Sequence, residues 1–396
     1  MSHSSSSCSL SRRRLLLNAP LIGLASQIPQ ALAAERASAE VSSRLWAEFC
    51  DSLKRVGERI LSPEAPDTPL DRAEGFRYLT RLLRVALEQE IEYSDPLFPG
   101  FYSLSGPTVK IGADNPDNLY YNAQVRGDRR YRITGRRGTV NYLAFSTKGG
   151  GYGRDGSLRP TGFLDSTQLE VGPDGRFEVI VSAERQPGNW LPMTPETTLL
   201  IVRQTFLDRA SEQPAELSIT CLDAPRGPEP LTPEALARQL ESAVKFVDAT
   251  VRVFADWAQT FKAQPNRFTR QDQSIYARAG GDPSIFYAHG YWELEPDEAL
   301  VVELPPTEAE FWNFQLNNYW MESLDYRYFN IHVNKRTAHY NPDGSVTVVI
   351  AHRDPGVPNW LDTTGHRAGT MLFRVVRGKD PEYPTARLVR LQDLRR

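Results

Sequence analysis

Two stretches near the N-terminus repeat apolar residues with the period of an α-helix. In residues 40–61 the apolar positions recur every three or four residues, at Leu45, Phe49, Leu53, Val56 and Ile60. The second stretch has Thr68 as a helix cap and Pro69 at the first helical position, and it continues to about Glu90. Its inward-facing residues are expected to be Phe76, Leu79, Leu82, Leu83 and Leu87. Together the two stretches predict a helical hairpin within residues 34–94.

A third apolar stripe, within residues 229–265, predicts a long single helix. Thr232 caps it, Pro233 occupies its first turn, and Pro265 ends it. The stripe consists of Leu236, Leu240, Val244, Val247, Val251, Phe254, Ala258 and Phe261. We interpret this helix as a spacer between two β regions.

The segments on either side of this helix, residues 95–228 and 266–396, have the pattern of short strands. Runs such as "FEVIVSA", "TLLIVRQTF" and "SVTVVIAHR" alternate or concentrate apolar and β-branched residues between turn signals. "PDGR" and "PDGS" are turns by their chemistry. The expected fold class is therefore α+β, mainly β with helices.

The two β regions also repeat one another. Each contains an Asp-Gly turn, a strand, the sequence Asn-Trp-Leu and a strand with Arg, at spacings that differ by one residue. Upstream, "NLYYNAQVRG" and "RGTVNYLAFS" of the first region match "EALVVELPPT" and "EFWNFQLNNYW" of the second. The repeat predicts two homologous β-sandwich lobes of the jelly-roll type.

The Asn-Trp-Leu elements have two interpretations. As a ligand platform, Trp190 and Trp360 would stack on a sugar or an apolar molecule. As a structural plug, each Trp would seal the end of a sandwich while its Asn bonds the turning backbone. The second interpretation is favoured because both lobes carry the element. Arg203 and Arg374 are expected to belong to the same feature, stacked on the Trp or bonded to loop carbonyls.

The order "FWNFQLNNYW", "DGSVTVVIAHRDPGVPNWLD" and "FRVVRG" resembles the domain of unknown function 1214 family over residues 285–380. The resemblance implies a jelly-roll-like C-terminal domain behind an apolar helix and a related N-terminal lobe. In some members that lobe is the companion domain of unknown function 1254. For the family as a whole the resemblance implies no established chemistry.

The first 33 residues have the composition of an export signal. A basic segment with Arg12 and Arg13 precedes an apolar stretch and a small-residue cleavage site that ends at Ala33, and the Arg pair resembles the twin-arginine type. We therefore expect a periplasmic or secreted protein with no stable membrane insertion after cleavage. The formal net charge is -3 and no basic run follows the signal, so nucleic acid is not an expected partner.

Candidate chemistry concentrates in the second lobe, which holds every His after the signal: His289, His332, His339, His352 and His366. His352 with Asp354, or His332, would serve as acid–base groups. No His-x-His or HExxH pattern indicates a metal site, and no motif identifies a cofactor. The only cysteines after the signal are Cys50 and Cys221. They could pair, although two separate buried thiols are favoured.

A polar and aromatic stretch from Gln315 to Asn330 predicts a ligand surface. The candidate ligand-binding residues are Asn318, Tyr319, Trp320, Tyr326, Trp360 and Arg374. The glycine-rich segment from Thr147 to Ser157 lacks the ending of a phosphate loop and predicts a hairpin tip. We expect a binding protein for a sugar-like or aromatic small molecule. The alternative is a hydrolase or lyase that uses the acid–base groups of the second lobe, and the pattern does not specify an oligomeric state.

Overall fold

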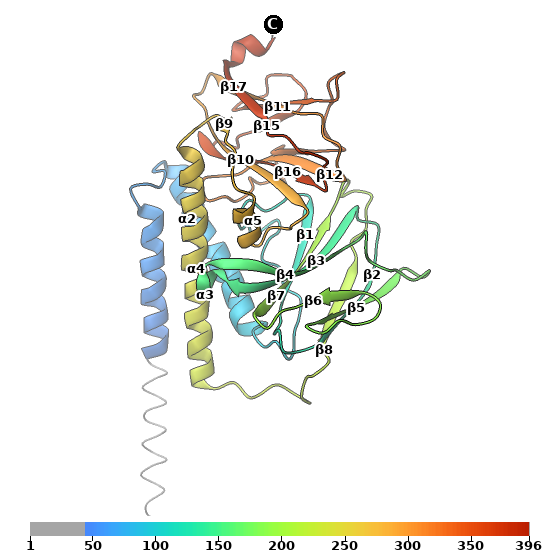
Figure 1. Cartoon of the computed structure of the whole chain (residues 1–396). Coiled ribbons are helices and arrows are strands. Elements are labelled where there is room, and N and C mark those ends of the chain that lie inside the picture. The colour runs from blue at the N-terminus through green and yellow to red at the C-terminus, as the bar shows by residue number, and fades with distance from the viewer. Residues whose placement is uncertain (1–43, 396) are drawn as a thin grey trace, which may run out of the picture. The chain divides into compact units, whose positions relative to one another are not determined.

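The computed structural model describes residues 44–395 (Figure 1). The chain divides after Glu48 into two compact units. Residues 44–48, the described part of the first unit, are helical. All features below belong to the second unit, which begins at Phe49. The expected export signal, residues 1–33, lies outside the described residues.

The first elements of this unit are helical. The helix that ends at residue 57 continues into the 3-10 turn η1 (Glu58–Leu61), and α2 (Pro69–Leu87) and the π turn η2 (Glu88–Glu92) follow. The Thr68 side chain accepts a hydrogen bond from the Asp71 backbone, so the expected cap is confirmed. The expected buried face is partly wrong, because Phe76 is 44% exposed while Tyr78 is fully buried. The reason is the packing partner, since α2 turns Gly75 and Tyr78 toward Trp320.

The long helix α4 (Pro233–Lys262) forms where the sequence predicts it. The Thr232 hydroxyl accepts from the Ala235 backbone, which satisfies one of the free N–H groups of the first turn. Its buried face includes Val247, Val251 and Phe254 from the predicted stripe. At about 1.5 Å per residue the helix is about 45 Å long. It packs against α2, against the short helix α3 (Tyr152–Asp155) and against the second lobe.

The first lobe is a β-sandwich of two four-stranded sheets. One sheet has the strand order β1-β7-β3-β4 and the other has the order β6-β5-β2-β8. Side chains that include Val179, Leu191 and Val202 fill the core between them. The strands are β1 (Asn118–Gln124), β2 (Tyr131–Arg136), β3 (Tyr142–Gly151), β4 (Ser157–Asp165), β5 (Arg176–Ser182), β6 (Trp190–Pro192), β7 (Thr197–Thr205) and β8 (Glu216–Cys221).

The second lobe repeats this arrangement. Its sheets have the orders β13-β12-β16-β10-β9 and β15-β14-β11-β17, so β10, β16 and β12 take the places of β1, β7 and β3. The duplication predicted from the sequence is confirmed, and so is the α+β class. The remaining elements are β9 (Arg267–Phe268), α5 (Ser274–Arg278), β10 (Ile285–Glu293), β11 (Glu298–Leu304), β12 (Phe311–Leu316), β13 (His332–Asn334), β14 (Val346–Ala351), β15 (Trp360–Asp362), β16 (Ala368–Val376), β17 (Thr385–Arg390) and η3 (Leu391–Arg395).

One equivalence within the predicted repeat is wrong. The segment "EALVVELPPT" contains β11, and β11 takes the place of β2 in its sheet. The segment "NLYYNAQVRG", which contains β1, corresponds instead to β10. An alternating strand pattern shows that a strand has a buried face, but it does not show which sheet the strand joins.

The Asn-Trp-Leu elements belong to the framework of each sandwich. The Asn359 side chain donates to the backbone carbonyls of His339 and Thr347 and accepts from the His339 N–H. Asn189 makes the same three bonds to two backbone positions of the first lobe. The Trp360 indole donates to a strand carbonyl at 3.0 Å. Each element therefore joins the end of a strand to a neighbouring turn.

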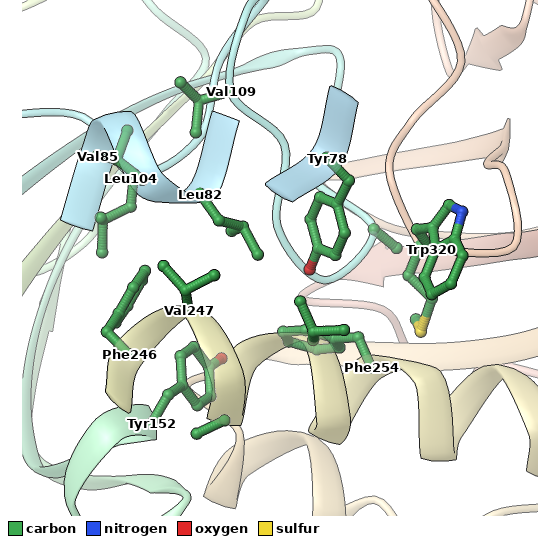
Figure 2. Packing of buried hydrophobic residues seen from close by; sticks show 14 of the residues in the cluster. Tyr78, Leu82, Val85, Leu104, Val109, Tyr152, Phe246, Val247, Phe254 and Trp320 are labelled. Atoms are coloured by element: carbon green, nitrogen blue, oxygen red, sulfur yellow. The ribbon is translucent and has the colours of Figure 1, made fainter. Parts of the chain in front are cut away.

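Helices and lobes meet in one further core. Side chains of α2 and α4 point toward one another there, including Leu82 and Val247 (Figure 2). Tyr152 of α3 and Trp320 of the second lobe join the same cluster. The glycine-rich segment forms the connection of β3 to β4, as expected for a hairpin tip. Its Tyr152 packs against Phe254 of α4. This core positions the walls of the cavity described next.

Candidate functional site

A cavity of about 130 Å³ is bordered by both lobes and by α4. Its polar wall comes from matching strands of the two lobes. Arg203 on β7 lies opposite Tyr120 on β1, and Arg374 on β16 lies opposite Tyr287 on β10. These strands take the same places in their sheets. The two Arg–Tyr pairs are therefore related by the internal repeat, and all four side chains line the cavity.

The rest of the wall is mainly apolar and aromatic. Phe254 and Trp257 come from α4, and Tyr152 comes from α3 (Figure 2 shows Tyr152 beside Phe254). Ile111 and Ile201 add aliphatic surface. Aromatic rings with few polar groups among them are typical of small-molecule sites.

Arg374 is fixed by several neutral acceptors. Its Nη1 donates to Gln315 Oε1 at 2.6 Å and to Asn313 Oδ1 at 3.3 Å. Its Nη2 donates to the Ala113 carbonyl at 2.6 Å. Burial lowers the pKa of Arg374, but a guanidinium starts so high that it stays charged at neutral pH.

Arg203 has fewer partners than Arg374. Its Nη2 donates to the Gly280 carbonyl at 2.6 Å, whereas its Nη1 is buried and has no hydrogen-bond partner. Burial lowers the pKa of Arg203, but the charge of Asp282 and the surrounding tyrosines outweigh burial and leave the pKa raised. A charged group that keeps an unused donor in a buried cavity is a candidate for ligand contact.

His289 is the second cavity residue with an unused polar atom. Its ring stacks between Phe261 at 5.0 Å and Tyr276 at 5.2 Å, and it meets Trp257 edge-on at 6.1 Å. Its Nδ1 is buried without a hydrogen-bond partner. Burial, with a smaller contribution from Arg374, lowers the pKa of His289 to about 3, so the imidazole is neutral at pH 7.

Among the residues predicted to bind a ligand, Arg374 lines this cavity. Tyr326 lies elsewhere in the second lobe, with the Lys110 ammonium 4.4 Å from its ring centroid. Trp360 belongs to the sandwich end described above.

Of the two contacts expected for the arginines of the repeat, bonding to loop carbonyls is found, because Arg203 bonds Gly280 and Arg374 bonds Ala113. The alternative of stacking on the Trp is not what the structure shows at Trp190, where Arg185 lies over the ring.

Three more predicted ligand residues lie buried where the second lobe meets the helices. The Asn318 amide donates to Glu322 Oε2 at 2.9 Å. The Tyr319 hydroxyl accepts from an amide of α4 at 2.7 Å, and the Trp320 indole donates to the Asp71 carbonyl at 3.1 Å. Each has a partner within the protein, so this segment connects the lobe to α2 and α4.

Two of the predicted acid–base residues, His352 and Asp354, lie near the edge of the second sandwich. His352 Nδ1 is 2.8 Å from Thr363 Oγ1, and its Nε2 is 3.2 Å from the Leu294 carbonyl. Asp354 accepts from the Gly356 N–H at 2.7 Å. Both ring nitrogens of His352 are thus engaged, and neither residue lines the cavity between the lobes.

The third, His332, connects the two lobes. Its Nε2 lies 3.1 Å from Asp117 Oδ1, and the same carboxylate accepts from Asn313 and Asn334. The structure therefore gives the three predicted acid–base groups separate hydrogen-bond partners. The hydrolase or lyase alternative stays a prediction.

Within residues 44–395, no group of three or more His, Cys, Asp or Glu side chains is placed to hold a metal ion. In the same range, no helix has the length and apolar character needed to cross a membrane. Cys50 and Cys221 are both free thiols, so these two cysteines are not paired. Cys221 is buried as expected, whereas the expected burial of Cys50 is wrong because its side chain lies on the exposed face of its helix.

Sequence reasoning missed Tyr120, Tyr287 and the cavity role of Arg203 and His289. The available signal was that each Arg of the repeat has a Tyr on an upstream strand. That signal becomes specific only when β1 and β10 are known to be neighbours of β7 and β16. The protein is thus of a two-lobed class in which two homologous β-sandwiches line one cavity.

The chain belongs to the family of proteins of unknown function called DUF1214, whose model matches it twice, at residues 121–205 and 294–380. A crystal structure of an uncharacterised protein from Burkholderia cenocepacia is 53% identical, with 90% of this chain and 99% of that chain covered and a TM-score of 0.88. The structure of the VPA0106 protein from Vibrio parahaemolyticus is 11% identical, with 79% and 97% covered and a TM-score of 0.48. No curated protein matches the sequence.

Proposed function

We propose that the protein binds a small organic molecule, aromatic or sugar-like, in the cavity between its two lobes. One observation carries the proposal: two residues that line the cavity, Arg203 and His289, each have a buried polar atom, Nη1 and Nδ1, without a hydrogen-bond partner in the protein. Leaving such atoms unpaired is costly, and a ligand that bonds them removes the cost. The aromatic wall supplies the complementary surface for the body of that ligand.

The second lobe, in which the sequence analysis places the ligand surface, provides part of the proposed site. His289, Tyr287 and Arg374 come from that lobe, while Arg203 and Tyr120 come from the first. The proposal therefore keeps the predicted kind of ligand and extends the site to both lobes.

A thermal-shift screen of the full chain against sugars and small aromatic compounds tests the proposal. A ligand at 100 times its Kd stabilises the folded state by about 2.7 kcal/mol. Ile111→Trp should fill the cavity and abolish the shift. Ile180→Trp, also half-buried but on β5, should leave the shift unchanged. A ligand whose shift survives Ile111→Trp binds elsewhere and would refute the proposed site.

We also propose that the chain is exported through a twin-arginine-type signal over residues 1–33, which would place the binding site in the periplasm or outside the cell. The supporting pattern is the Arg12-Arg13 pair before an apolar stretch and the small residues at Ala33. Replacing both arginines of the pair by Lys should retain the precursor in the cytoplasm, whereas Arg14→Lys should not. Sequencing of the exported chain should begin at Ala34; a mature protein that stays in the cytoplasm would contradict export. The resemblance of the N-terminal half to the companion domain of unknown function 1254 stays a prediction.

A further inference from the structure

Two buried guanidinium groups share one small cavity, and none of their protein acceptors is charged. Arg203 bonds a backbone carbonyl, and Arg374 bonds a backbone carbonyl and two side-chain amides. Buried cations are normally paired with a carboxylate at hydrogen-bond distance. Within the described residues, both arginines have only neutral oxygens as hydrogen-bond partners. An anion bound in the cavity would therefore be their only charged hydrogen-bond acceptor.

The two arginines and the two tyrosines act on one another as a single electrostatic cluster. The hydroxyls of Tyr120 and Tyr287 both contribute to the pKa values of Arg203 and of Arg374. The charge of each arginine is felt in turn at Tyr287. All four side chains line the same cavity, where a low local dielectric strengthens the attraction of the two positive charges for an anion.

Buried carboxylates offset part of this positive charge from a greater distance. Asp282 acts on Arg203, while Asp114 and Asp117 act on Arg374. Their oxygens already have partners. Asp282 Oδ1 accepts from the Ser284 backbone and hydroxyl, and its Oδ2 accepts from the Tyr142 hydroxyl at 3.4 Å. The two oxygens of Asp114 accept from the backbone and the hydroxyl of Ser323. These carboxylates partly offset the cost of burying the two positive charges, but they do not occupy a hydrogen-bonding position next to either guanidinium.

The two lobes differ in what surrounds the arginine, so that Arg203 has a buried nitrogen without a hydrogen-bond partner and Arg374 does not. In the second lobe, Asn313 lies opposite Arg374 in the β12–β16 register, and it bonds the guanidinium together with Gln315. In the first lobe, Ala144 lies opposite Arg203 in the β3–β7 register. An alanine offers no acceptor there. Arg203 is thus positioned to bond a ligand, while Arg374 is held as a fixed charge on the other side of the repeat.

The histidine complements an anion without adding a charge. His289 is neutral and caged by rings, so its Nδ1 can donate a hydrogen bond while the cage keeps the imidazole from turning. The corresponding residue of the first lobe, Asn122, also lines the cavity, but its side-chain oxygen already accepts from the Leu104 N–H. The cavity residues with an unpaired buried nitrogen are therefore Arg203, at Nη1, and His289, at Nδ1, one from each lobe. In the tautomer that carries its proton on Nδ1, His289 donates as Arg203 does.

The volume and the walls limit the rest of the ligand. By the same measure of volume a water needs about 10–15 Å³, so the cavity of about 130 Å³ suits a molecule of about ten non-hydrogen atoms. Aromatic side chains from α3, α4 and α5 form much of its wall: Tyr152, Phe254, Trp257 and Tyr276. Flat aromatic bodies pack against such rings by stacking or edge contacts.

Building on the proposed function, we infer that the ligand is a small aromatic carboxylate, of the size of benzoate, whose carboxylate bonds Arg203 and His289 and whose ring lies against the aromatic wall. Arg374 contributes the second positive charge and positions the site through Gln315 and Ala113. A carboxylate fits a guanidinium edge in a planar, directional geometry that a hydroxyl or amide does not reproduce.

Isothermal titration calorimetry of the full chain at pH 7.5 tests the inference with matched probes. The anions are benzoate, phenylacetate and 4-hydroxybenzoate. Benzamide and phenylacetamide have the same shape as the first two but no charge, while acetate and inorganic phosphate have charge but no ring. We expect at least one aromatic carboxylate to bind at least about tenfold more tightly than its amide and than acetate or phosphate.

Substitutions at Arg203 provide the second arm. Arg203→Met should weaken the aromatic carboxylate by about 10- to 100-fold, with little effect on a neutral ring compound. Arg203→Lys, which keeps the charge, should recover part of the affinity. Arg132→Met removes an exposed arginine of β2 and should change the affinity by less than about twofold. Melting temperatures of the variants without ligand show whether each one is folded.

The outcomes separate this inference from the proposal on which it rests. If amides or sugars bind as tightly as the carboxylates and Ile111→Trp abolishes their binding, the binding function stands and the charge assignment is overturned. If acetate or phosphate binds as tightly as the aromatic acids, the ring assignment is overturned. If no probe and no compound of the thermal-shift screen binds, both proposals fail.

Discussion

Asn359→Ala should destabilise the second lobe more than the same change at Asn189 destabilises the first. Each asparagine makes three hydrogen bonds that join a strand end to a turn. At about 1 kcal/mol each, their loss costs about 3 kcal/mol. Asn359 also has a φ of 53°, whereas Asn189 lies outside the left-handed region. Alanine in that region costs about 1 kcal/mol more, so the expected loss at Asn359 is about 4 kcal/mol.

The free energies of unfolding come from urea titrations followed by tryptophan fluorescence, with equal slopes as the condition for comparing midpoints. Asn359→Gly removes the same hydrogen bonds but tolerates the positive φ, so it should be less damaging than Asn359→Ala. A smaller loss for Asn359→Ala than for Asn189→Ala would refute the reasoning, because the hydrogen-bond count is the same at both sites and only the backbone conformation differs.

Three further predictions concern the pH dependence, the close packing and the buried ion pair. Burial lowers the pKa of His289 from 6.5 to about 3, so between these pH values the unfolded chain binds more protons than the folded one. The free energy of unfolding should therefore fall by about 2 kcal/mol from pH 7 to 5. In urea titrations His289→Asn should remove this pH dependence, and an unchanged pH dependence would contradict the role of His289. Gly369→Ala would bring a Cβ within 2.1 Å of a backbone oxygen and should lower the melting temperature strongly. Gly57→Ala is the control, because its Cβ meets nothing within 4 Å, and it should stabilise the protein by about 0.5–1 kcal/mol. Equal effects of the two changes would show that close packing is not the cause. Arg81→Met leaves the Glu322 carboxylate buried without its guanidinium partner and should lower the free energy of unfolding by about 3–5 kcal/mol, as measured by chemical denaturation. Adding Glu322→Gln should recover part of this loss, and no recovery would contradict a charge effect.

Local patterns were sufficient for the elements whose signals are contained in a few neighbouring residues. Thr232 and Pro233 mark the start of α4, and the observed cap follows because a Thr hydroxyl satisfies a free N–H of the first turn. The repeated Asp-Gly turns and Asn-Trp-Leu elements likewise predicted the duplication, because the same short sequence signals occur in both lobes. The Asn side chains then make matching hydrogen bonds, to positions 11 to 20 residues away. The face of α2 was only partly predicted, because Phe76 and Tyr78 are both apolar enough to be buried and the neighbouring core decides between them.

The sequence by itself determined that the chain has two related sandwiches, a long helix between them and an Arg near the end of each repeat. It did not determine that Arg203 and Arg374 would line one cavity, because that depends on how two sheets and α4 are placed against each other. It also did not show that Arg203 keeps an unused donor, since Ala144 and Asn313 differ in effect only through their positions opposite the two arginines. Secondary structure follows from interactions between residues near in sequence, whereas the site depends on contacts between strands that lie far apart along the chain.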